Sequence, residues 1–142
     1  LAAGARVLVL AAPPRATARL LAQAARGGSP DLVITDCTSV KRSIVRQARY
    51  LGLRHFVGGH PVAGNEGRGF PASSAGLFRG RAWVLTPEGA SARALRLVRA
   101  LVRATGARPV TMRCGRLFWP VRRSVREAFF PDACASLRCR RD

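Results

Sequence analysis

Short apolar runs alternate with amphipathic segments over most of this 142-residue chain, and this alternation limits the fold more than any other feature. The runs have the length and composition of strands buried on both faces of a sheet, whereas the amphipathic segments repeat their apolar residues at helical spacing. The expected strands are residues 6–10, 31–35, 55–57, 82–85 and 108–112. The expected helices cover about 15–26, 39–51 and 90–105. This order predicts an α/β fold with a largely parallel sheet, and the length suits one domain.

The second expected helix and the loop after the third strand give further detail. Ser39 suits the N-cap of the helix, because a serine side chain can accept a hydrogen bond from the first turn. Lys41 is expected on the outer face of the helix, among arginines. The expected apolar stripe comprises Val40, Ile44, Ala48 and Leu51. A glycine-rich loop is expected from Gly58 to about Phe70, followed by a short helical piece that ends at Phe78.

The charge of the chain is strongly positive. It has 25 Lys and Arg against 7 Asp and Glu, a formal net charge of +18, and Lys41 is the single lysine. Such a charge makes nucleic acid the first partner to consider. The arginines, however, fall opposite the apolar stripes of three expected helices, where any amphipathic helix carries solvated charges. We therefore expect no nucleic-acid partner, and a basic α/β nucleic-acid-binding module without enzymatic activity is the alternative.

The last part of the chain differs from the rest. Residues 109–142 hold 8 of the 24 arginines and three of the four cysteines, and their apolar spacing is irregular. Cys134 and Cys139 have no second Cys or His pair at the spacing of a zinc site, so no metal is expected.

The start of the chain also constrains the interpretation. The only methionine is Met112, so Leu1 is not an initiator residue, and we expect that the front of the protein has been cut away. No apolar run approaches the ~20 residues that cross a membrane, so no membrane partner is expected. We expect a cytoplasmic protein.

Two polar clusters follow neighbouring strands. His60 comes after two glycines that would let the backbone approach a ligand, and an imidazole with a pKa near ~6.5 can accept a proton at neutral pH. The segment Thr35–Lys41 follows the preceding strand. Because parallel strands end at one edge of a sheet, Ser39 and His60 are expected to meet across one cleft, where a helix N-terminus favours an anion. The alternatives are a histidine that only bonds backbone groups and helix capping by Thr38 or Ser39.

Four blocks, in order along the chain, resemble the prephenate/arogenate dehydrogenase family. They are Val9-Leu10-Ala11 with Pro13-Pro14, Thr35-Asp36 with Ser39-Val40-Lys41, Gly58-Gly59-His60-Pro61 with Ala63-Gly64 and Glu66, and Leu77-Phe78 with Trp83-Val84-Leu85-Thr86-Pro87. The resemblance runs from about Val7 to Met112. It implies that residues 1–112 are the later part of a Rossmann-like nucleotide-binding domain, and that 113–142 are an irregular, unmatched tail rich in Arg and Cys.

The resemblance also implies an enzyme of tyrosine biosynthesis that oxidises prephenate or arogenate with NAD or NADP. A hydride leaves the ring carbon that bears the hydroxyl, and the ring carboxylate leaves as carbon dioxide. By this resemblance His60 holds the hydroxyl and assists its deprotonation, and Ser39 orients His60 near the nicotinamide. Glu66 and Gly59 would bind or gate the substrate. The residues implied in cofactor binding are Pro13, Pro14, Thr38 and Ser39.

The chain departs from the family pattern in several places. The strand–G-x-G-x-x-G–helix loop is absent, and nothing after Met112 resembles the family's helical second domain, which supplies dimer contacts. Thr38 stands where the family has a small residue, and Asn65 where it has Ser or Thr. We therefore expect a fragment with little or no activity as an isolated chain. A homodimer is expected only for the full-length protein.

Overall fold

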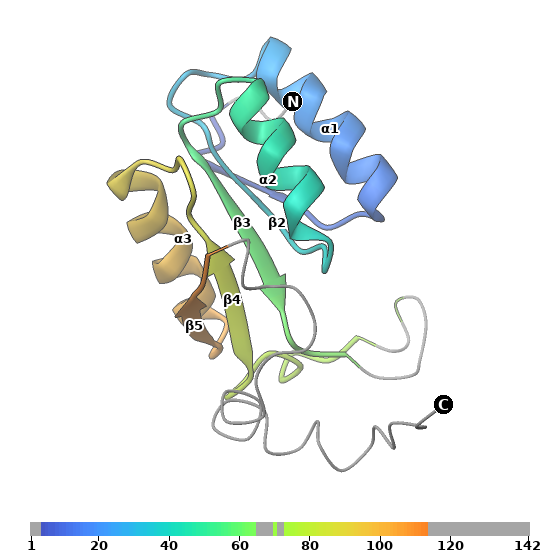
Figure 1. Cartoon of the computed structure of the whole chain (residues 1–142). Helices are drawn as coiled ribbons and strands as arrows, with labels where there is room; N and C mark the ends of the chain where they lie inside the picture. The colour runs from blue at the N-terminus through green and yellow to red at the C-terminus, as the bar shows by residue number, and fades with distance from the viewer. Residues whose placement is uncertain (1–3, 65–69, 71–72, 114–142) are drawn as a thin grey trace.

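The structure, a computed structural model, describes residues 4–64, 70 and 73–113. Its single sheet has the strand order β1-β2-β3-β4-β5, with β1 at Val7–Leu10, β2 at Val33–Asp36, β3 at Phe56–Pro61, β4 at Ala82–Thr86 and β5 at Arg108–Thr111. The described helices are α1 (Pro14–Gly27), α2 (Lys41–Tyr50) and α3 (Ala92–Ala104). Figure 1 shows α1 and α2 on one face of the sheet and α3 on the other. The predicted α/β class is confirmed.

The sheet is mostly parallel, as predicted. β1, β2 and β3 pair in parallel, β4 runs antiparallel to β3, and β5 is parallel to β4. The parallel neighbours are joined through α1, α2 and α3, because a parallel connection needs a crossover. As a result, β1 to β3 end at one edge of the sheet, which we call the His60 edge, and β4 and β5 end at the opposite edge.

Each face of the sheet has its own core. Successive strand residues point to opposite faces, so Val33 packs toward α3 while Ile34 packs toward α1 and α2. The core beneath α1 and α2 includes Leu10, Leu21, Ile34, Ile44, Val45 and Phe56. The core beneath α3 includes Val33, Val57, Leu85, Val98 and Val102. Burial on both faces explains why β4 is apolar from Ala82 to Leu85 rather than alternating.

The start of α2 differs from the prediction. The helix begins at Lys41 with Val40 as its N-cap residue and has no side-chain capping bond, so the expected cap by Ser39 is wrong. Val40 is 49% exposed, although it was expected in the apolar stripe, and Lys41 is only 3% exposed, although it was expected outside. The reason is that Lys41 turns inward to the carboxylate of Asp36, which rotates the first turn relative to the simple apolar pattern.

The segment between the third and fourth strands also differs. β3 continues through Gly58, Gly59 and His60 to Pro61, because antiparallel pairing with β4 extends the strand, so the expected loop does not begin at Gly58. Residues 75–80 form turns rather than a short helical piece. Residues 65–69 of the glycine-rich segment, and all of the predicted tail except Arg113, lie outside the described residues.

Candidate functional site at the His60 edge

The two predicted polar clusters lie at the same edge of the sheet. β2 ends at Asp36, and the register that pairs Thr35 with Val57 makes β3 extend past the end of β2. The backbone N–H of Gly59 donates to Oδ1 of Asp36 at 3.0 Å, which joins the two strands beyond their backbone pairing. The sequence-based expectation that these strand ends converge is therefore confirmed at Asp36 and Gly59.

Asp36 is the most highly coordinated side chain of this edge. It is fully buried, and its Oδ2 accepts hydrogen bonds from Thr38 N at 3.1 Å and from Thr38 Oγ1 at 2.5 Å. Lys41 Nζ forms an ion pair with the same oxygen and also donates to Thr38 Oγ1 at 3.1 Å. A buried carboxylate is tolerated only when its charge is paired and its lone pairs are satisfied, and these donors meet both conditions.

This buried ion pair was missed in the sequence, where Lys41 was expected in solvent. One signal in the sequence could have revealed it. The chain uses arginine for every basic residue except this one, so a lysine here indicates a site that arginine does not fit. The ammonium of lysine is compact, whereas a guanidinium needs a planar, wider site.

His60 lies next to this ion pair on the α2 side of the sheet. Gly58 faces Val45 and Lys41 of α2, and His60, two residues further along the strand, points to the same face. Burial lowers the pKa of His60 below its usual 6.5, the charge of Lys41 lowers it further, and Asp36 opposes both. His60 is therefore neutral at pH 7. Its Nδ1 atom is buried and has no hydrogen-bond partner among the described residues.

The two glycines before His60 are required by close packing of protein atoms. A Cβ on Gly58 would overlap Thr86 Oγ1, and a Cβ on Gly59 would overlap the backbone oxygen of Asp36. Thr35 Oγ1 and Trp83 Nε1 would each lie 3.0 Å from a Cβ on Gly59. The space beside both glycines is thus occupied by the chain itself rather than left open for a ligand.

The other predicted residues are placed as follows. Ser39 is exposed in the connection between β2 and α2, one residue after Thr38, whose hydroxyl bonds Asp36 instead of capping the helix. Pro13 and Pro14 are exposed and follow β1, so they lie at the His60 edge as well. Pro13 is the N-cap residue of α1 and Pro14 is its first residue, so the Pro-Pro pair opens the helix. Glu66 lies outside the described residues.

The two helix N-termini at this edge lack side-chain caps. α1 and α2 both begin here, and neither has a side-chain capping bond. α3 begins at the opposite edge, and there Ser91 Oγ accepts a capping bond from Ala94 N at 3.1 Å. The positive end of the helix dipole at the N-termini of α1 and α2 favours an anion. Together with the unpartnered Nδ1 of His60, they fit an anionic ligand at the His60 edge.

Other features of the described residues carry less chemistry. Burial raises the pKa of the Cys37 thiol, with Asp36 adding to the rise and Lys41 opposing it, so the thiol stays protonated and poorly nucleophilic. Within 4–64, 70 and 73–113, no group of His, Cys, Asp and Glu side chains could hold a metal ion. None of the helices found there has the length and apolar character needed to span a bilayer.

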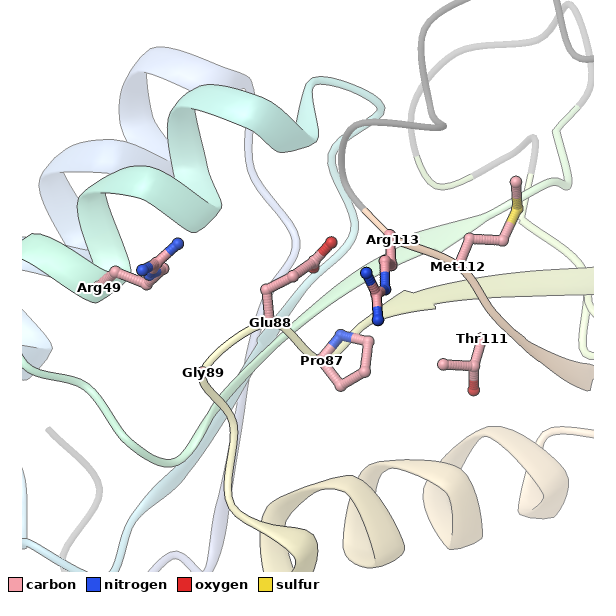
Figure 2. Close-up of a pocket in the computed structure, with 7 residues that line it drawn as sticks. All are labelled: Arg49, Pro87, Glu88, Gly89, Thr111, Met112 and Arg113. Carbon is pink, nitrogen blue, oxygen red and sulfur yellow. The ribbon is translucent and has the colours of Figure 1, made fainter.

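A pocket of about 560 Å³ lies at the other edge of the sheet, where β4 and β5 end. Figure 2 shows its lining, with Glu88 and Arg113 beside these two strand ends and Arg49 from the end of α2. Because β4 is antiparallel to β3, this pocket lies toward the amino end of β3, away from His60. None of the residues predicted from the sequence to form a site lines it.

Comparison with known protein families gives a match over most of the chain. A family model described as prephenate dehydrogenase, nucleotide-binding domain, matches residues 1–111. The prephenate dehydrogenase of Lactococcus lactis subsp. cremoris (strain MG1363) is 40% identical over 93 residues, which are 63% of this chain and 26% of that enzyme.

Solved structures show the same fold. Prephenate dehydrogenase from Aquifex aeolicus, in complex with hydroxyphenyl propionate and NAD+, matches with a TM-score of 0.74 and 28% identity, over 79% of this chain and 40% of that chain. Synechocystis arogenate dehydrogenase matches with a TM-score of 0.74 and 28% identity, over 80% of this chain and 41% of that chain. The chain therefore spans less than half the length of each of these relatives.

Proposed function

The chain belongs to the prephenate dehydrogenase family, whose nucleotide-binding domain matches residues 1–111, and from this premise we propose that its His60 edge supplies the catalytic base of an NAD(P)-dependent dehydrogenase. The substrate class is prephenate or arogenate, and the reaction is an oxidative decarboxylation, one step of tyrosine biosynthesis. The resemblance predicted from the sequence is confirmed by the family match, which favours this enzyme over a nucleic-acid-binding module.

The observation that carries the proposal is the state of His60. Its imidazole is partly buried and neutral, because burial and Lys41 lower its pKa, and its Nδ1 has no partner among the described residues. A general base must be unprotonated at working pH and must have a free ring nitrogen at the reacting group. The other histidine among the described residues, His55, does not offer a free Nδ1, because that atom is bonded to Ser91 Oγ at 2.7 Å.

In this proposal His60 accepts the proton of the substrate hydroxyl while a hydride leaves the carbon that bears it. The ring carboxylate departs as carbon dioxide, and its bonding electrons complete the aromatic ring. A bound nicotinamide cofactor supplies the hydride acceptor. Ser39 would orient His60, and the ring nitrogen of His60 that is left unprotonated would receive the substrate proton.

The remaining residues would hold the ligands. Pro13 and Pro14, with the N-terminus of α1, which has no side-chain cap, would contact the cofactor, together with Thr38 and Ser39 before α2. The Aquifex relative was solved with NAD+, and the cofactor here is NAD or NADP. Glu66 would line the mouth of the substrate site, and Gly59 would position the backbone beside it.

Domain organisation and assembly belong to the same proposal. Residues 1–112 would be the later part of a Rossmann-like nucleotide-binding domain, and residues 113–142 a separate Arg- and Cys-rich segment. The homodimer expected for the full-length protein would involve parts beyond the described residues.

A hybrid enzyme tests the proposal. In this hybrid enzyme, the segment of the Lactococcus lactis prephenate dehydrogenase that matches this chain is replaced by the corresponding residues of this chain. We expect it to reduce nicotinamide only when prephenate or arogenate is present, with release of one carbon dioxide per hydride transferred. Four assays, each substrate with NAD and with NADP, identify the pair it uses.

The matched control is the Lactococcus lactis enzyme itself, purified and assayed in parallel. Circular dichroism and cofactor binding show whether the hybrid enzyme is folded. A folded hybrid enzyme that binds nicotinamide but turns over neither substrate would contradict the proposed function.

A further inference from the structure

Asp36 accepts hydrogen bonds from Gly59 and Thr38 in addition to its ion pair with Lys41. Its two oxygens point to different segments of the chain. Oδ1 accepts from Gly59 N on β3, whereas Oδ2 accepts from Thr38 and Lys41 at the start of α2. A fully buried carboxylate with donors on both sides acts as a crosslink between the segments that supply them.

This crosslink replaces backbone pairing where the sheet ends. β2 and β3 pair through Ile34 with Phe56 and through Thr35 with Val57. Past this point the connection between β2 and α2 turns away, and the next bond from β3 toward β2 is Gly59 N to the side chain of Asp36. The position of Gly59 relative to that connection therefore depends on a side chain and not on the β ladder between β2 and β3.

The crosslink is one residue away from both functional groups. Gly59 immediately precedes His60, and Thr38 immediately precedes Ser39. A shift of either segment would move its functional side chain by a similar amount. We propose that Asp36 is a positioning residue, which holds the His60 strand and the Ser39 connection in one fixed arrangement; this inference rests on the proposed function.

The electrostatics agree with this role. Lys41 and Asp36 act in opposite directions on the pKa of His60, so their pair keeps the charge beside the imidazole balanced. The Asp36→Asn variant disturbs this balance and the crosslink together. The amide of asparagine has one oxygen that accepts hydrogen bonds and one NH₂ that only donates. If its oxygen faces Gly59 N, its NH₂ faces the donors of Thr38 and Lys41, and the reverse orientation places the NH₂ against Gly59 N.

Nuclear magnetic resonance of the full 142-residue chain tests the crosslink without any activity. In Asp36→Asn we expect hydrogen exchange at Gly59 N–H to rise by about 10-fold or more, the scale of a lost bond to a charged acceptor. The His60 imidazole should titrate at lower pH than in the wild type, because the charge that raised its pKa is gone. At a fixed pH the imidazole resonances of His55, the only other histidine, should not move, so they serve as an internal control.

Two further variants keep this test decisive. Val102→Ala removes buried volume beneath α3, on the opposite face of the sheet from α1 and α2, and should destabilise the chain without altering Gly59 or His60. If Asp36→Asn does not fold, Thr38→Val removes one donor to Asp36 and should shift the same two signals by a smaller amount. Unchanged Gly59 exchange and unchanged His60 titration in a folded Asp36 variant would overturn the proposal.

Kinetics of the hybrid enzyme separate positioning from folding. In Asp36→Asn, kcat should fall on the order of 10- to 100-fold with little change in KM for the cofactor, since misplacing a reacting group by about 1 Å costs this much. The acidic limb of the pH profile should move to lower pH, and neither effect should occur in Val102→Ala. Full kcat in a folded Asp36→Asn hybrid enzyme would overturn the proposal. A wild-type hybrid enzyme without turnover would instead contradict the proposed function, and the resonance measurements then decide the role of Asp36.

Discussion

Replacing Lys41 by methionine leaves the charge of Asp36 buried without its ion-pair partner. Asp36 is 0% exposed and Lys41 3%, so solvent cannot compensate for the loss. Breaking a buried pair costs about 3–5 kcal/mol. Asp36 keeps three donors, from Gly59 N, Thr38 N and Thr38 Oγ1, so we expect the lower end, about 3 kcal/mol. This is a large fraction of the ~5–15 kcal/mol that stabilises a domain.

The assay is urea unfolding at fixed pH and salt, with the free energy of unfolding extrapolated to water. Arg46→Met is the matched control, since Arg46 is an exposed cation on the same helix and its loss should cost no more than about 0.5 kcal/mol. The double variant Asp36→Asn with Lys41→Met buries no charge, so it should be more stable than the sum of the single changes by about 2 kcal/mol. A Lys41→Met variant within about 1 kcal/mol of wild type, or strictly additive single changes, would show that the pair is not a coupled buried unit.

Three further predictions concern packing, capping and pH. Gly59→Ala should cost about 2–3 kcal/mol, because its Cβ would overlap the backbone oxygen of Asp36, whereas Gly27→Ala meets no neighbour and should be neutral or stabilising in thermal unfolding. Ser91→Ala should cost about 1 kcal/mol by removing the cap of α3, and a chain as stable as wild type would exclude that role. Because burial lowers the pKa of His60 below its unfolded value of 6.5, the unfolded chain binds this proton more tightly. The free energy of unfolding should therefore increase as the pH rises from the folded pKa of His60 to about 6.5, and decrease over the same range on acidification. His60→Gln should flatten this pH dependence.

The α/β class and the order of strands and helices could be predicted from the sequence, because burial determines where apolar residues occur along the chain. In Ala82–Thr86, for example, apolar residues lie on both faces, which specifies a sheet covered on both sides, and helical spacing then identifies the helices. The antiparallel β4 could not be predicted in the same way. Its direction depends on the path of the chain between Pro61 and Ala82, where no apolar periodicity constrains the connection.

The candidate site was predictable in position but not in its internal contacts. The convergence of strand ends follows from parallel topology, so the sequence alone places the segments of Ser39 and His60 at the same edge. The inward turn of Lys41 could not, because helical periodicity assigns charged residues to solvent and ignores a carboxylate at the end of a neighbouring strand. Helix capping by Ser39 failed because Thr38 and Lys41 both bond Asp36, which sets where α2 begins.

The most direct test of the proposed chemistry compares two histidine variants of the hybrid enzyme. His60→Asn removes the base, and we expect kcat to fall on the order of 10²- to 10⁴-fold, the usual effect of losing a general base. His55→Asn, which removes the other histidine of the chain, should keep kcat close to wild type. Equal turnover in the two variants, with both proteins folded and cofactor bound, would show that His60 is not the catalytic base.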